Sequence, residues 1–405
     1  MAQQKIVIVG ANFAGLSAAS KLGKKADVVI IDPSASFEWT PNIHELVSGI
    51  KSHRSVAISS EKIASRLGHR FIQQRVEQID AADQGVQLDD GFTLHYDALL
   101  LSCGHIAAGQ NIPGAAEHSV GFRHVEQAKL VQQRIAEQLQ SGKPMRISIV
   151  GGGFTGVEVL GELLRKYRDN PNLEINVIDA APRLLPGLPA VIDKDIRKQC
   201  KNQPVKFYLK RKIKSITAKA VQLQGSAHVA SDLVIMCAGT TLPPFVLQSG
   251  LTQNASGIKV NDSLQCAKFP NIFVAGDIAA TKPPLKKQAS YAIDMGHHAG
   301  SNIGRFFRNK PLKSFAHGKK PLVLAFGDLN TYFIYGNTVF ASPLLAPLKE
   351  AVYQISMAQF SASLPIAQQG LGIASRYTRS IKNMLLPELL RLRFNDVLMH
   401  SRRLQ

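Results

Sequence analysis

Short apolar runs that end in glycine recur along the chain. Ile6–Val9 leads into Gly10, and the mostly apolar run Ile147–Val150 leads into Gly151, and a helical pattern follows each glycine. A short apolar run bounded by glycine is typical of a strand that is buried on both faces in a parallel sheet. The pattern therefore predicts two strand–turn–helix units, one near the start of the chain and one in its middle.

The two units share further landmarks in the same order. Each first strand is followed by a second one that ends in aspartate, Val28–Asp32 and Ile175–Asp179. Each unit later contains an apolar strand that closes on glycine, Leu99–Gly104 and Val234–Gly239. This internal duplication predicts an α/β fold with two doubly wound, Rossmann-like nucleotide-binding domains and a C-terminal helical region.

Proline and glycine residues between the apolar segments indicate where the domains end. A further apolar strand, Ile272–Asp277, follows the second unit, and we expect it to return to the first domain. The predicted ranges are 1–114 with 245–315 for a discontinuous first domain, 115–244 for the second, and 316–405 for the C-terminal region.

The second glycine turn has the spacing of a dinucleotide-binding motif. Gly151 allows a tight turn, Gly153 lets the backbone approach a pyrophosphate, and Gly156 packs the helix against the strand. Asp179 then hydrogen-bonds a ribose diol and repels a 2′-phosphate, which favours NADH over NADPH, while Arg183 would soften that repulsion. Phe154 and Thr155 complete the predicted turn.

The first turn departs from this pattern, because Asn12 replaces the middle glycine. Asparagine tolerates a positive φ better than most residues, so we expect the turn to survive. Asp32 follows Gly10 at about the 20-residue distance of a ribose-binding carboxylate. The predicted nucleotide-binding residues of this turn are Gly10, Asn12, Phe13, Ala14, Gly15 and Asp32.

Composition narrows the classes of protein. With 45% hydrophobic and 19% charged residues, the 405-residue chain is globular, and its net charge of +19 favours an anionic partner. The four cysteines, at positions 103, 200, 237 and 266, form no CxxC pair, so a disulfide scaffold, a zinc site and a dithiol redox centre are not expected. The adjacent His297 and His298 point in different directions on a helix, and we predict no metal site.

The N-terminal residues show no signal-peptide pattern, and no stretch of 18 apolar residues occurs. We therefore expect a cytoplasmic protein that is not inserted as a membrane-spanning helix.

Taken together, these motifs resemble the two-dinucleotide-binding-domain flavoproteins of the pyridine nucleotide-disulfide oxidoreductase superfamily. Phe273–Asp277 is similar to the second flavin motif of that superfamily, and Tyr96–Gly104 is similar to its ATG-type segment. The resemblance implies FAD in the first domain and NAD(P)H in the second. It also implies further FAD contacts from Val76, Ser102, Gly104, Gly276, Asp277, Gln288 and Ala289, and NADH contacts from Glu158 and Gly239.

Within this superfamily, the missing cysteine pair argues against the disulfide and sulfide:quinone reductases. Gly151–Glu158 resembles both the type II NADH:quinone dehydrogenases and the apoptosis-inducing-factor-like, ferroptosis-suppressor-type quinone reductases, and residues 311–355 look more like the latter. The implied catalytic residues are Glu158, Gln288 and Lys349. Ala292 replaces the second glutamine that type II dehydrogenases carry beside the flavin.

The end of the chain carries a basic amphipathic pattern. Within 373–385, Ile373, Tyr377, Ile381 and Met384 share one helical face, opposite Arg376, Arg379 and Lys382. Such a helix is suited to an anionic membrane interface. A pair of core-packing helices with basic outer faces is the alternative.

The resemblance, together with the basic tail pattern, implies an FAD-dependent NADH:quinone oxidoreductase, peripheral on the inner face of the cell membrane, with NADPH as a second donor left open. Its partners are a quinone and an anionic membrane surface. No nucleic acid is expected, and a homodimer is left open. One alternative is a soluble flavin reductase that donates electrons to a small iron–sulfur protein. Another is an apoptosis-inducing-factor-like flavoprotein that binds nucleic acid.

Overall fold

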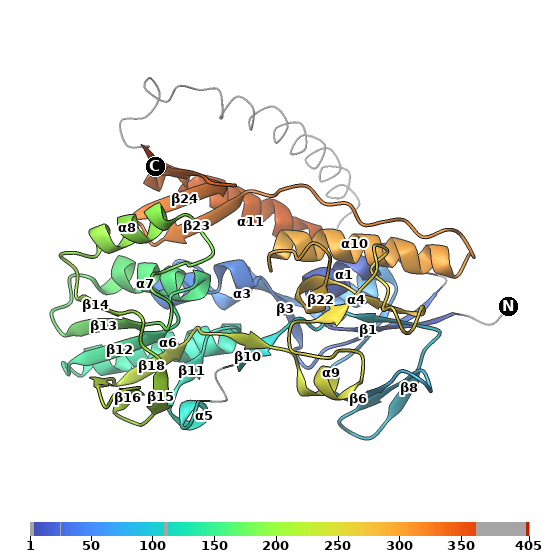
Figure 1. Ribbon diagram of the computed structural model, residues 1–405, viewed down its shortest axis with the longest axis horizontal. Helices are drawn as coiled ribbons and strands as arrows, with labels where there is room; N and C mark the ends of the chain where they lie inside the picture. Colours follow the sequence, from blue (N-terminus) through green and yellow to red (C-terminus); the bar gives the residue numbers. More distant parts are fainter. Residues whose placement is uncertain (1–3, 25, 109–111, 362–401, 405) are drawn as a thin grey trace. The chain divides into compact units, whose positions relative to one another are not determined.

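The computed structural model describes residues 4–24, 26–108, 112–361 and 402–404, which form two compact units (Figure 1). The first unit combines the N-terminal residues up to Glu38 with Ala57–Ile106 and Thr240–Gly318. The second combines Trp39–Val56, Ala107–Gly239 and the chain from Lys319 onward. The first domain expected from the sequence contained residues 39–56, whereas this segment clusters with the second unit.

The first unit is built on a parallel sheet in the strand order β21-β9-β1-β2-β5. The strands are β1 (Lys5–Val9), β2 (Asp27–Ile31), β5 (Arg70–Ile72), β9 (Ala98–Leu101) and β21 (Ile272–Val274). Strands β1, β9 and β21 are apolar and almost wholly buried, as expected for the centre of a sheet that is covered on both faces. β21 pairs with β9, so the chain returns to the first unit as the sequence suggested.

Helices and smaller strands complete the first unit. The helices are α1 (Phe13–Ala19), α4 (Ser60–Leu67), α9 (Pro244–Gln248), α10 (Ala289–Phe306) and the 3₁₀ helix η3 (Gly276–Ile278). An antiparallel sheet contains β6 (Val76–Asp80), β7 (Gly85–Leu88) and β8 (Thr93–His95). Short pairs join β3 (Ser36–Glu38) to β4 (Ala57–Ser59), β10 (Ile106–Ala107) to β19 (Thr240–Thr241), and β20 (Ile258–Lys259) to β22 (Ala279–Ala280).

The second unit repeats this plan with the strand order β11-β18-β12-β13-β14, again parallel. The strands are β11 (Val120–Gly121), β12 (Met145–Val150), β13 (Leu173–Ile178), β14 (Val205–Tyr208) and β18 (Leu233–Met236). Helices α6 (Val125–Gln140) and α7 (Phe154–Tyr167) pack on β12 (Figure 1). Four strands of each sheet follow the same order, β9-β1-β2-β5 in the first unit and β18-β12-β13-β14 in the second, and a glycine turn follows β1 and β12. The two parallel sheets confirm the predicted α/β fold of two Rossmann-like units.

Other elements surround this second sheet. They are η1 (Thr40–Asn42), α2 (Glu45–Ser48), α3 (His53–Val56), α5 (Ala115–His118), α8 (Ala190–Gln199), η4 (Pro343–Leu345) and α11 (Ala346–Ser361), with the antiparallel strands β15 (Ile213–Ile216), β16 (Ala220–Leu223) and β17 (His228–Ala230). A second antiparallel sheet contains β23 (Leu322–Phe326), β24 (Asn330–Tyr335), β25 (Thr338–Ala341) and β26 (Arg402–Leu404). Helix α2 packs on α6 and α7, which places segment 39–56 against the second unit's core.

The amphipathic pattern at 373–385 lies outside the residues that the structure describes. In the described part of the chain, no helix has both the length and the apolar character needed to cross a membrane.

Candidate functional site

The first glycine turn joins β1 to α1 and leaves no room for side chains at two positions. Gly10 has a φ of +106°, and a Cβ there would lie 2.7 Å from the carbonyl carbon of Ser102. A Cβ on Gly15 would lie 1.9 Å from the Gly10 oxygen. The Ser102 hydroxyl, buried at the end of β9, donates to the Val9 and Gly10 carbonyls at 2.9 and 3.1 Å. The turn is therefore fixed by backbone contact, as a dinucleotide-binding turn requires.

Asn12 and Asp32 complete this turn. The Asn12 side chain accepts a hydrogen bond from the Phe13 amide at 2.8 Å and caps α1. One carboxylate oxygen of Asp32 accepts from the Ala11 amide at 2.8 Å, and the other accepts from the Ser34 amide at 2.8 Å. Asp32 thus lies against the turn at the end of β2, where a ribose-binding carboxylate is expected.

The second flavin-like motif, at the end of β21, and helix α10 both lie against the first turn and its helix α1. Gly296 packs so closely on α1 that a Cβ there would lie 2.2 Å from the Ala14 oxygen. Gly276 has a φ of +79°, and its Cβ would lie 3.2 Å from that of Ala14. Gln288 is the N-cap residue of α10, and Ala289 is its first residue. The structure therefore brings Ala14, Gly276 and the start of α10 together from distant parts of the sequence.

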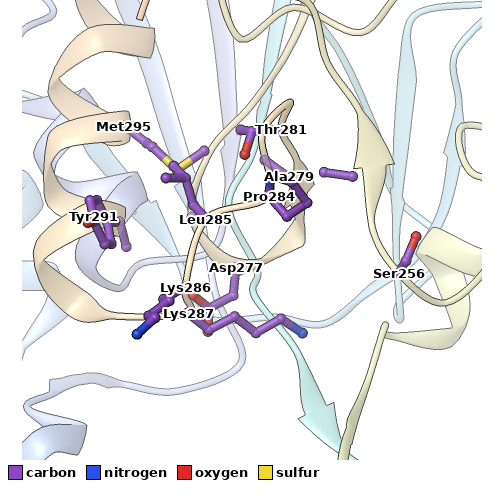
Figure 2. Close-up of a pocket in the computed structure, with 13 residues that line it drawn as sticks. Ser256, Asp277, Ala279, Thr281, Pro284, Leu285, Lys286, Lys287, Tyr291 and Met295 are labelled. Carbon is purple, nitrogen blue, oxygen red and sulfur yellow. The ribbon is translucent and has the colours of Figure 1, made fainter. Parts of the chain in front are cut away.

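A cavity of about 240 Å³ lies beside this region (Figure 2). Asp277, Thr281, Lys287, Tyr291 and Met295 line it, together with eight further residues. Asp277, which the resemblance assigned to FAD binding, lies on this lining rather than in the core. Because the cavity combines an apolar wall with a carboxylate and lysines, it has the mixed lining of a ligand site.

A buried histidine that the sequence did not single out contacts this lining. His105 is buried, and its Nε2 lies 2.9 Å from the Lys287 Nζ. Since the lysine ammonium can only donate, the imidazole accepts at Nε2. Gly104, with a φ of +66°, directly precedes His105. Val76 is half-buried at the start of β6 and packs on the core of the first unit.

The second turn, between β12 and α7, repeats the first one. Gly151 has a φ of +108°, and a Cβ on Gly156 would lie 1.9 Å from the Gly151 oxygen. A Cβ on Gly153 meets no described atom of the chain within 4 Å, so the space in front of the turn is open. Phe154, 40% exposed, and Thr155 begin α7 beside this space.

Asp179 at the end of β13 makes the same pair of bonds as Asp32. Its carboxylate accepts from the Gly152 amide at 2.5 Å and from the Ala181 amide at 2.6 Å. Gly239, after β18, has a φ of +66° and lies beside Ala108. In each unit an aspartate is thus bonded to the glycine turn itself, and the second turn has open space at Gly153. Both turns fit a dinucleotide.

A cluster of charged side chains lies in the second unit, around Glu158 on α7. Lys349 on α11 donates from Nζ to Glu158 Oε1 at 3.0 Å and lies 3.0 Å from His44 Nε2. The His44 Nδ1 lies 3.5 Å from Glu158 Oε2. The side chains of Glu158, Lys349 and His44 are only 12%, 11% and 3% exposed. The structure therefore joins two of the predicted catalytic residues through a direct ion pair.

Burial shifts the titration of this cluster. Burial raises the pKa of Glu158, and the charge and hydrogen bond of Lys349 oppose that rise. Burial and the neighbouring Lys349 hold the pKa of His44 well below its usual range, so the imidazole is neutral. A neutral imidazole that accepts at Nε2 carries its proton on Nδ1, which faces Glu158.

The cluster extends through alternating charges to the surface. Glu45 lies 3.9 Å from Lys349 and 3.7 Å from Lys51. Lys51 in turn pairs with Glu350 at 2.7 Å and lies 4.0 Å from the centre of the Tyr353 ring. Glu350 is 43% exposed, whereas Lys51 is 9% exposed. Segment 39–56 and α11 are thus held together by ion pairs within the second unit.

A second buried carboxylate lies one turn along α7. Glu162 is fully buried, accepts a hydrogen bond from the Ser48 hydroxyl and lies 3.3 Å from the Arg165 guanidinium. Burial raises its pKa to about 7, although the Ser48 hydrogen bond and Arg165 act in the opposite direction. Two acids with raised pKa values therefore share one helix.

Thiol chemistry is not supported at either turn. All four cysteines are free, and burial raises the pKa of Cys103 and Cys200 to about 12. Burial also raises the pKa of Cys237. A protonated thiol is a poor nucleophile. The described residues contain no group of three histidine, cysteine or acidic side chains able to hold a metal ion.

Sequence reasoning missed His44, Glu45 and Lys51. They belong to no motif. Only the fold shows that segment 39–56, which follows the first strands of the first unit in sequence, is part of the second unit. Trp39 and Asn42 gave no signal either, although Trp39 donates to Asn42 at 2.9 Å and Asn42 donates to Glu45 at 2.8 Å.

Comparison with known proteins agrees with this geometry. The family model described as pyridine nucleotide-disulphide oxidoreductase matches residues 4–296. The chain therefore belongs to this family, which confirms the predicted superfamily and identifies the protein as an oxidoreductase. The predicted cofactors, FAD and NADH, are confirmed by this family membership.

Individual relatives cover most of the chain. The type II NADH:quinone oxidoreductase of Haemophilus influenzae is 25% identical over 86% of this chain and 91% of its own length. The demethylphylloquinone reductase NdbB of Synechocystis is 27% identical over 77% of this chain and 81% of its own length. NDH2 from Plasmodium falciparum in complex with NADH has a TM-score of 0.80 at 16% identity, covering 88% of this chain and 95% of that one, so it shares the fold.

Proposed function

We propose that this chain is an NADH:quinone oxidoreductase, with NADH on the turn at Gly151 and FAD on the turn at Gly10. When bound, FAD supplies the redox chemistry by accepting a hydride and returning two electrons. The Haemophilus and Synechocystis relatives support a quinone as the acceptor through their names, type II NADH:quinone oxidoreductase and demethylphylloquinone reductase. The protein's own groups bind, orient and supply protons.

The observation that carries this proposal is the ion pair between Lys349 and Glu158. A quinone that takes up two electrons also takes up two protons, so its site needs groups that hold and release protons. Glu158, with its raised pKa, and the Lys349 ammonium are such groups, and the neutral His44 connects to both. No thiol is required, in keeping with the high pKa values of the cysteines.

Their roles follow from chemistry. Lys349 carries the proton that a developing hydroquinone oxygen can accept. Glu158, the carboxylate of the ion pair, holds the ammonium in place and can take up a replacement proton because burial raises its pKa. Glu45 and Lys51 continue the chain of ionisable groups toward Glu350, whose exposure allows exchange with solvent. We propose Gln288 as a cofactor contact at the start of α10, on the FAD side.

We also propose that the protein works peripherally at the inner face of the cell membrane. Long-chain quinones reside in the bilayer, and a chain with a net charge of +19 is attracted to an anionic leaflet. The basic stripe within 373–385 supports this proposal from the sequence.

One assay series tests the function. Purified protein loaded with FAD is given NADH and, separately, a short-chain ubiquinone, a menaquinone analogue, ferricyanide, oxygen and a small ferredoxin. We expect fast quinone reduction. A preference for ferredoxin, with negligible quinone turnover, would replace this proposal with a soluble iron–sulfur reductase.

A DNA mobility-shift assay at several salt concentrations tests the other alternative. Tight, salt-dependent binding with negligible turnover of every acceptor would favour a nucleic-acid-binding flavoprotein.

A further inference from the structure

The loop between β13 and α8 closes over the second glycine turn. The Leu185 amide donates to the Gly152 carbonyl at 2.8 Å, and a Cβ on Gly152 would lie 2.8 Å from the Leu184 side chain. Leu184, Leu185 and Leu188 are buried, while Leu185 has a φ of +49°. This left-handed conformation is uncommon for leucine, so other contacts must hold the loop in place.

Arg183 is one of these contacts. One guanidinium nitrogen donates to the Leu184 and Leu185 carbonyls at 3.4 and 3.0 Å. The other donates to the Pro186 and Leu188 carbonyls at 2.6 and 2.7 Å. Four carbonyls of one short loop therefore converge on a single planar cation, a geometry that arginine provides and lysine does not.

Asp193 holds the same loop from the α8 side. Its side chain is buried, and it accepts a hydrogen bond from the Leu184 amide at 2.9 Å. An arginine and an aspartate, of opposite charge, thus fix one backbone segment. Their shared effect is on the position of the loop.

The loop begins directly after Asp179. The Asp179 carboxylate bonds to Gly152 and to Ala181, so its orientation depends on both the glycine turn and the start of the loop. With its guanidinium turned toward the loop carbonyls, Arg183 is not placed to neutralise a 2′-phosphate beside Asp179. The sequence had suggested that Arg183 softens this repulsion, and its contacts correct that suggestion.

We propose that Arg183 sets the selectivity of the nucleotide site for a ribose 2′-hydroxyl over a 2′-phosphate, as a positioning residue that holds loop 180–189 and with it Asp179. The inference rests on the proposed binding of NADH at the turn of Gly151. Arg183 thus influences the choice of nucleotide through the backbone of loop 180–189.

The backbone of two other cationic residues is hydrogen-bonded to Asp179 or to its neighbour Ala181. The Arg211 amide donates to the Asp179 carbonyl, and the Lys210 amide donates to the Ala181 carbonyl, both at 3.0 Å. Both side chains are exposed. As exposed cations whose backbone lies beside Asp179, both are candidates to contact a 2′-phosphate, and Arg211→Gln therefore belongs in the test.

The experiment measures binding of two redox-inactive ligands, ADP-ribose and 2′-phospho-ADP-ribose, by titration calorimetry on the FAD-loaded protein. The variants are R183Q, R183K and D193A, with R211Q for the neighbouring cation. R134Q, an exposed arginine on α6, is the matched control. Thermal unfolding and flavin absorbance show that each variant is folded.

We expect wild type to prefer ADP-ribose. R183Q, R183K and D193A should each lower the affinity for ADP-ribose by about tenfold, equivalent to ~1.4 kcal/mol. The affinity for 2′-phospho-ADP-ribose should fall by less. The preference for ADP-ribose over 2′-phospho-ADP-ribose therefore becomes smaller in all three variants, although Arg183 and Asp193 carry opposite charges. R134Q should match wild type, and R211Q should weaken only the phosphorylated ligand.

A different pattern overturns the inference. If R183Q selectively loses affinity for 2′-phospho-ADP-ribose while R183K retains that affinity, Arg183 is a phosphate ligand. If R183Q and D193A keep the wild-type preference for ADP-ribose over 2′-phospho-ADP-ribose, Arg183 has no positioning role. If wild type binds neither ligand, the proposed NADH site itself is wrong, which is a separate outcome.

Discussion

Lys349 and Glu158 form an ion pair with a 3.0 Å contact although 191 residues separate them in the sequence. Glu158 comes from the helix that opens on the second glycine turn, and Lys349 comes from α11 near the end of the described chain. Neither side chain is more than 12% exposed. A carboxylate tied to the nucleotide-binding helix is thereby paired with a cation from a different part of the unit.

Removing either partner should impair quinone reduction. We expect Glu158→Gln and Lys349→Met to lower kcat with a short-chain quinone by about 100-fold, the usual contribution of a positioned acid or base. NADH oxidation by ferricyanide, which needs no protons, should stay within about threefold of wild type. Arg134→Gln serves as the control. Equal losses with both acceptors would assign the pair to folding or to cofactor binding.

The first glycine turn should be required for the flavin. A Cβ on Gly15 would overlap the Gly10 carbonyl, so Gly15→Ala must distort the turn. We expect the purified variant to lack visible flavin absorbance and to bind added FAD weakly. Gly23→Ala is the matched control, because a Cβ there meets no described atom within 4 Å. A yellow Gly15→Ala protein would contradict the assignment of FAD to this turn.

Glu162 should make stability depend on pH. Its pKa is about 7 in the folded chain against an ordinary 4.5, so the folded state binds the extra proton between these values. Stability from this group is therefore complete below pH 4.5 and is lost as the pH rises to 7, by roughly 3 kcal/mol. Glu162→Gln should flatten the fall in unfolding free energy between pH 5 and 8, measured by urea denaturation. An identical pH slope in both proteins would refute the shift.

Neutralising the basic stripe should release the protein from membranes. Each cation near an anionic leaflet contributes up to about 1 kcal/mol, so replacing Arg376, Arg379 and Lys382 by glutamine should weaken binding to anionic liposomes by about 100-fold. Sedimentation with vesicles measures this, and ferricyanide activity should persist. Substitution is preferable to deleting the tail, because β26 (Arg402–Leu404) pairs with β25 and would be lost with it. Unchanged liposome binding would favour core-packing helices.

The local chemistry of the two nucleotide turns could be predicted from the sequence. Gly10, Gly15, Gly151 and Gly156 occupy positions where the backbone itself excludes a Cβ, and such a constraint acts over a few neighbouring residues. The repeated apolar strands then imply a parallel sheet, because only a buried strand is apolar on both faces. The duplication, the fold class and the likeness to a flavoprotein family all followed from such short-range patterns.

The charged cluster was decided by tertiary structure alone. Glu158 and Lys349 were singled out by resemblance, but no pattern predicted their contact, and nothing marked His44, 305 residues before Lys349. Arg183 shows the same limit: its distance from Asp179 in sequence suggested a phosphate ligand, whereas its guanidinium turns to four loop carbonyls. Pairings and pKa values of this kind depend on burial and on which distant elements pack together. Short-range spacing determines a turn, but only the completed fold determines which charges share a dry environment.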